Sequence, residues 1–172
     1  MKITRNAAMS MYKHLGAMAL GYLTERTLEV VMSNFAALAK VASDMNQLKK
    51  ELMSRIYQGI EESHKKAFFE LISKMEIEKD IAKKEALTET AKAEYNDVWK
   101  LYAKHINVII SLLEKEVEIE IEPVDEQEFM KGVLMGKKDA PIREIKAVFS
   151  PMFQTEPMET DLSELDDLLK TF

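Results

Sequence analysis

The residues that could carry out chemistry in this sequence are few and far apart. Its three histidines are His14, His64 and His105, and no two of them have the His-x-x-His spacing of a zinc site. Diiron sites in helical proteins need two Glu-x-x-His pairs, and the sequence does not supply two. His105 lies within an apolar stripe, where we expect a histidine packed between helices with one hydrogen-bond partner. We therefore predict no catalytic residue and no metal site.

The sequence also lacks the glycine-containing motifs of loops that bind phosphate or position a nucleophile. The chain contains no GxxxxGK[ST], GxGxxG or GxSxG sequence, and its five glycines are scattered. It contains no cysteine, which excludes disulfides, thiol nucleophiles and cysteine-based zinc sites. We predict that the protein uses no cofactor.

An alternating segment from 117 to 122 is the first candidate for partner binding. Val117, Ile119 and Ile121 alternate with three glutamates, and Pro123 ends the pattern. This period of two predicts a strand with one apolar face and one acidic face. The expected neighbour is the segment 1–3, or the same strand of another subunit. The glutamates could bind a divalent cation, but an exposed or partner-facing row on an edge strand is the favoured interpretation.

The segment 154–172 is the second and sharper candidate. It has six acids and one base, so it carries most of the net charge of −6, and the rest of the chain is nearly balanced. Its apolar residues have helical spacing, which suits folding into a groove on a partner. Packing on the protein's own body is the alternative. The predicted contact residues are Leu162, Leu165, Leu168, Leu169 and Phe172, with Asp161, Glu164, Asp166 and Asp167 giving orientation.

The elements expected to position these segments are mostly helices. After a predicted cap at Thr24, one apolar seam comprises Val31, Phe35, Leu38, Ala42, Met45, Leu52 and Ile56. A second comprises Leu87, Ala91, Tyr95, Val98, Tyr102, His105, Ile109 and Leu112. The charged stretch 76–86 between them is expected to hold the chain reversal or to be a solvated part of one helix.

These patterns predict a mainly α protein. We expect a long antiparallel helical hairpin or bundle, with a minor strand pair formed by residues 1–3 and 117–122. Short C-terminal helices are predicted after Asp125, ending at Gly136, and after Pro141. The predicted organisation is a helical domain over 1–153 followed by the acidic amphipathic tail.

Composition narrows the class of partner. Of the 172 residues, 47% are hydrophobic and 31% charged, which is typical of a globular chain. Lysine pairs occur, but each lies among acids, so nucleic-acid binding is not favoured. No apolar run is long enough to span a membrane, and the first residues do not read as a secretory signal.

Several segments in order resemble a family of small proteins of unknown function encoded by tailed bacteriophages and prophages. The similar segments are 1–6, a helical hairpin, 93–96, 113–121, 123–125 and 150–152. The acidic tail is not part of this resemblance. The resemblance implies a phage origin and expression inside a bacterium, and it brings no catalytic residues.

Together these patterns lead us to expect a non-enzymatic, phage-type protein that binds another macromolecule in the cytoplasm of a bacterial host. The most specific version is inhibition of a host defence protein. The alternatives are a structural or assembly subunit of a phage particle, with self-association, and a nucleic-acid-binding accessory protein. The expected partner is thus a host or phage protein. Whether the chain also forms a homo-oligomer is left open by the sequence.

Overall fold

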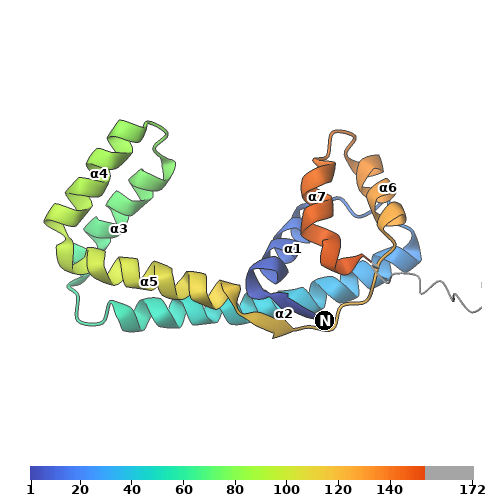
Figure 1. Ribbon diagram of the computed structural model, residues 1–172, viewed down its shortest axis with the longest axis horizontal. Coiled ribbons are helices and arrows are strands. Elements are labelled where there is room, and N and C mark those ends of the chain that lie inside the picture. The colour runs from blue at the N-terminus through green and yellow to red at the C-terminus, as the bar shows by residue number, and fades with distance from the viewer. Residues whose placement is uncertain (154–172) are drawn as a thin grey trace, which may run out of the picture. The chain divides into compact units, whose positions relative to one another are not determined.

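The computed structural model describes residues 1–153 and is mainly α-helical with a small antiparallel sheet, which confirms the predicted fold class. Figure 1 shows the order of elements along the chain. They are β1 (Lys2–Thr4), α1 (Arg5–Ala17), α2 (Glu25–Ile56), α3 (Glu62–Ile77), α4 (Ile81–Glu94), α5 (Asn96–Glu114), β2 (Glu116–Glu118), α6 (Glu126–Gly136), α7 (Ile142–Phe149) and the 3-10 turn η1 (Ser150–Met152). Among the described residues, no helix has the length and apolar character needed to cross a membrane.

The chain divides into two units, which we describe separately. The hairpin unit comprises Lys2–Met9 and Ala39–Val117. The terminal unit comprises, among the described residues, Met1, Ser10–Leu38 and residues 118–153. Helices α1 and α2 each contribute residues to both units.

The core of the terminal unit is built around phenylalanines from its C-terminal helices. The ring of Phe129 on α6 lies 5.3 Å from that of Phe149 on α7 and 5.7 Å from that of Phe153. Asp125 caps α6 as predicted, its carboxylate accepting a 2.7 Å hydrogen bond from the backbone N–H of Glu128. Helix α7 begins directly after Pro141, also as predicted.

The segment that follows β2 is fixed in the terminal unit by backbone pairing and by one buried side chain. The Met1 amino group donates to the Ile119 carbonyl, and the Ile119 N–H donates to the Met1 carbonyl, each at 2.9 Å. The buried Asn34 amide donates to the Glu122 carbonyl and accepts from the Glu122 N–H, both at 2.8 Å. These contacts hold the chain extended beyond the short β2 ladder.

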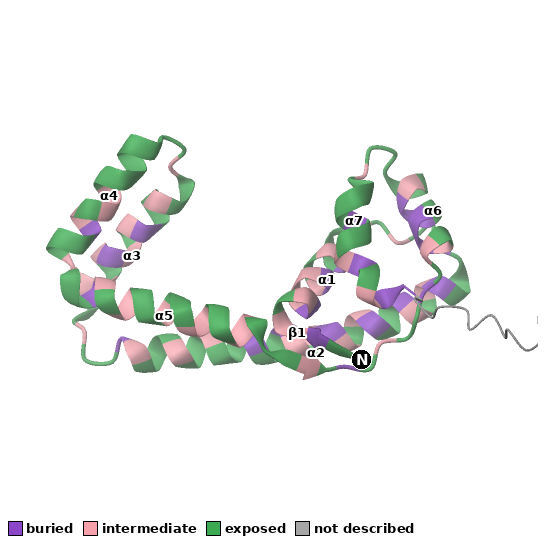
Figure 2. Ribbon diagram, viewed as in Figure 1, coloured by how far each residue is buried: buried purple, intermediate pink, exposed green. Residues whose placement is uncertain are grey.

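The hairpin unit has an aromatic core centred on Phe68. This fully buried ring lies 5.5 Å from Tyr102 and 6.4 Å from Trp99, both on α5. The buried members of the core are Tyr57, Phe68, Ile72, Ala91 and Val98. Helices α3 and α4 lie side by side as an antiparallel pair, and α4 exposes most of its surface (Figure 2). Gly59, with φ +89°, makes the turn between α2 and α3.

The second predicted seam forms two helices rather than one. Tyr95 has φ −128° and ψ 42°, which breaks the helix between α4 and α5. Its ring packs 4.8 Å from His64 and 6.1 Å from Phe68, so tertiary contacts stabilise the break. The charged stretch 76–86 contains both the reversal after Ile77 and the start of α4, where Asp80 caps the helix by accepting from the Lys83 N–H at 3.1 Å.

Candidate functional site

The alternating segment that contains the predicted contact residues Val117, Ile119 and Ile121 turns its apolar face inward. Ile119 is buried, Val117 and Ile121 are half-buried, and the three alternating glutamates are exposed. The side-chain alternation therefore continues through residue 122, although the β2 ladder ends at Glu118. Since these apolar side chains contribute to the protein's own packing, a partner would meet the acidic face or the strand edge. Their role in binding stays a prediction.

The predicted contact residues of the acidic tail, from Asp161 to Phe172, lie outside the described residues. Their role also stays a prediction that the structure does not address.

His105, the histidine in the second apolar seam, is packed against and hydrogen-bonded to a neighbouring tyrosine. His105 Nδ1 and the Tyr57 hydroxyl are hydrogen-bonded at 3.1 Å, and their rings meet edge to face. Burial lowers the pKa of His105 and raises the pKa of Tyr57 to about 12, Tyr102 adding to the second effect. Both side chains are thus held neutral at physiological pH, as suits a packed pair between α5 and the turn that follows α2.

Two histidines of the described residues have a carboxylate close by: His14, whose Nε2 lies 3.4 Å from Glu144, and His64. The Nε2 of His64 lies 3.3 Å from Asp97 on α5, and the pKa of Asp97 is lowered by hydrogen bonds from the Val98 N–H and from His64. Glu61 stands three residues before His64, but its carboxylate accepts from the Ser63 hydroxyl instead. Within residues 1–153 no three His, Asp or Glu side chains converge in a way that could hold a metal ion.

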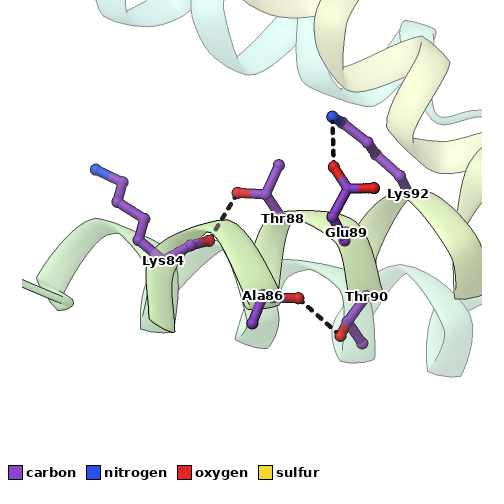
Figure 3. A network of polar contacts seen from close by, with 6 residues as sticks. All are labelled: Lys84, Ala86, Thr88, Glu89, Thr90 and Lys92. Atoms are coloured by element: carbon purple, nitrogen blue, oxygen red, sulfur yellow. Dashed lines mark hydrogen bonds and ion pairs between the residues drawn. The ribbon is translucent and has the colours of Figure 1, made fainter. Parts of the chain in front are cut away.

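The polar side chains of α4 mostly bond to their own helix (Figure 3). The Thr88 hydroxyl donates to the Lys84 carbonyl at 2.8 Å, and the Thr90 hydroxyl donates to the Ala86 carbonyl at 2.9 Å. Such bonds to the preceding turn satisfy the hydroxyl groups locally. These threonines therefore show no arrangement that would activate a nucleophile.

The most exposed large apolar side chains of the described chain lie where α3 turns into α4. Ile77 is 79% exposed at the end of α3, and Ile81 is 76% exposed at the start of α4. Along α3, Ile77 borders a shallow hollow that it shares with the half-buried Phe69 two turns earlier. We call this surface the α3 face; it is lined by Lys66, Phe69, Glu70, Ser73, Lys74 and Ile77.

The α3 face combines apolar residues with a charged border. Phe69 and Ile77 supply the apolar area, and Lys66, Glu70 and Lys74 surround it. An apolar centre within a polar rim is the usual anatomy of a protein–protein contact, whereas catalysis would need convergent titratable groups. The arrangement can thus bind another protein's apolar side chains without reacting with them.

Sequence reasoning did not single out the α3 face. Phe68 and Phe69 are neighbours in the sequence, yet Phe68 is buried and Phe69 is half-buried on the adjoining stripe of α3. The available signal was the eight-residue interval from Phe69 to Ile77, which places both on one side of a helix.

No protein-family model matches the chain, and no curated protein or solved structure matches it either. The resemblance to a phage family thus rests on the sequence segments alone.

Proposed function

We propose that this chain is a non-enzymatic protein that binds another protein, with the α3 face as a contact surface. The observation that carries the proposal is the exposure of Ile77 and Ile81 at one end of the α3–α4 pair, together with the hollow that Ile77 shares with Phe69 along α3. Single exposed apolar residues are common, but a cluster bordered by charges is typical of an interaction site.

The partner we propose is a bacterial host protein that this chain blocks or redirects inside the cell. The resemblance to phage and prophage proteins supports this choice, as does the acidic tail with leucines at helical spacing. Two separate segments, the α3 face and residues 161–172, would then contribute to binding.

Affinity capture from a bacterial lysate, read by mass spectrometry, tests the proposal. The full-length protein should retain one host protein. Ile77→Lys should reduce its capture about tenfold or more, because a charge in the centre of an apolar contact is costly to desolvate. Met135→Lys is the matched control, since Met135 is also strongly exposed but lies on α6.

A chain ending at Phe153 separates the contributions of the two segments. If truncation abolishes capture while Ile77→Lys captures the host protein as well as the wild type does, the binding site lies in the tail and not on the α3 face. Failure of the full-length protein to retain any host protein would overturn the proposed function.

The alternative function is a structural or assembly subunit that acts by self-association. This function is favoured by a further group of exposed apolar side chains, which includes Ile106 and Ile110 on α5.

A further inference from the structure

Helix α5 is apolar over more of its circumference than its own unit buries. One stripe, comprising Val98, Tyr102, His105, Ile109 and Leu112, includes the side chains that meet the Phe68 and Tyr57 rings. A second stripe lies one residue further along the helix. We call it the α5 stripe; it comprises Trp99, Ala103, Ile106, Ile110 and Leu113.

The α5 stripe is exposed at its centre. Ile106 is 37% exposed and Ile110 is 48% exposed, and Ala103 is exposed. At the two ends, Leu113 is half-buried, and Trp99 is half-buried because its ring also packs on Phe68 in the hairpin core. The intervals between its members are four, three, four and three residues. This is the heptad spacing with which one helix packs against another along a straight seam.

The charges beside the stripe are arranged symmetrically. Lys100 and Glu114 are exposed and occupy the same heptad position on one flank, each seven residues from the exposed Asn107. If two α5 helices pack antiparallel about Asn107, Lys100 of each copy comes close to Glu114 of the other. Parallel packing would leave these two residues at opposite ends of the seam. The charge pattern is therefore self-complementary only in the antiparallel arrangement.

We propose that the α5 stripe binds the α5 stripe of a second copy of this chain in an antiparallel, two-fold symmetric dimer. The interface is isologous, so a single apolar stripe and one charge of each sign suffice to complete it. This inference does not depend on the proposed function, because the α5 stripe and the α3 face share no residue.

The length of the stripe limits the affinity. Fourteen residue steps separate Trp99 and Leu113, which corresponds to a seam of about 21 Å. A seam of this length buries less than the roughly 800 Å² per partner of a standard stable interface. We therefore expect a reversible dimer with a dissociation constant in the micromolar range, on the order of 10 μM.

Sedimentation velocity of the full chain across concentrations around that value tests the proposal. Trp99 is the only tryptophan, so its fluorescence should also shift to shorter wavelength as the dimer forms. Ile110→Lys should weaken dimerisation by about 100-fold, because it places two charges in the apolar seam. Ile142→Lys is the matched control: Ile142 is 40% exposed at the start of α7, and its replacement should leave dimerisation unchanged.

Charge reversal tests the antiparallel register. Lys100→Glu and Glu114→Lys should each weaken the dimer by about tenfold, and the double variant should restore it. Lys100 and Glu114 are both exposed, so the far-UV circular dichroism of all three variants should match that of the wild type. A protein that sediments as a monomer at every concentration would overturn the dimer. A dimer that tolerates Ile110→Lys, or a double reversal without restoration, would overturn this interface.

Discussion

At the scale of single residues, Asn34 is a buried polar side chain that joins α2 to the extended segment after β2 in the terminal unit. Asn34→Ala would leave the N–H and carbonyl groups of Glu122 without their side-chain partner at a partly buried position. We expect a loss of about 2–4 kcal/mol in the free energy of unfolding, measured by urea denaturation. Asn46→Ala, at an exposed position of the same helix, is the control and should change it by less than about 0.5 kcal/mol. Equal midpoints for the two variants would contradict the role of Asn34.

His105 should make stability depend on pH in a defined window. Burial lowers its pKa in the folded protein below the ordinary value of 6.5, so the unfolded chain binds the proton more readily. The free energy of unfolding should thus be at its full value above pH 6.5 and fall as the pH drops below it. His105→Gln should lessen the difference between pH 7.5 and pH 5.5 in denaturation experiments.

That window is separate from the acid range. The pKa values of Asp97 and Glu128 are also lowered, the latter mainly by hydrogen bonds from Thr24 and Thr27, so their contributions are lost only at a lower pH. A slope between pH 7.5 and 5.5 that His105→Gln leaves intact would mean that another group titrates there.

At the scale of elements, the close approach of α6 to the loop before α2 requires a glycine. A Cβ atom at Gly132 would lie 2.5 Å from a methyl carbon of the buried Leu23 and 3.2 Å from the Tyr22 carbonyl oxygen. The side chain of Leu23 would have to move, and the backbone oxygen leaves little room. Gly132→Ala should lower the thermal midpoint, with a cost of about 1–3 kcal/mol. Gly21→Ala, which meets nothing within 4 Å, should not lower it.

Local signals predicted element ends well. Thr24, Asp125 and Pro141 mark the starts of α2, α6 and α7 because capping and proline preferences act within a few residues. The alternation at 117–122 also showed directly which side chains face inward, although only Glu116–Glu118 forms the β2 ladder. In each case the information lies in the same short segment as the structure.

Features that depend on distant contacts were not predictable in this way. The apolar seam continues across Tyr95 without glycine or proline, and only the packing of that ring on Phe68 and His64 reveals the break. The α3 face also depends on contacts between residues that are distant in the sequence. Phe68 and Phe69 are adjacent and chemically identical, and the neighbours of α3 decide that Phe68 is fully buried while Phe69 is only half-buried.

At the scale of the whole molecule, the two units have separate cores, and this should be visible in hydrogen exchange. Phe68 is fully buried in the hairpin unit, and Phe129 is fully buried in the terminal unit. Replacing either by alanine should cost about 3–5 kcal/mol in its own unit. Where amides exchange by opening of that unit, this cost corresponds to exchange about 100- to 1000-fold faster or more.

Phe68→Ala should therefore accelerate exchange in α3, α4 and α5 and leave the amides of α6 and α7 near their wild-type rates. Phe129→Ala is the reciprocal control and should show the opposite pattern. Helix α2 contributes residues to both units, so its first half should respond to Phe129→Ala and its second half to Phe68→Ala. Equal acceleration throughout the chain in both variants would show instead that the two cores unfold as one cooperative unit, with α2 as the element that couples them.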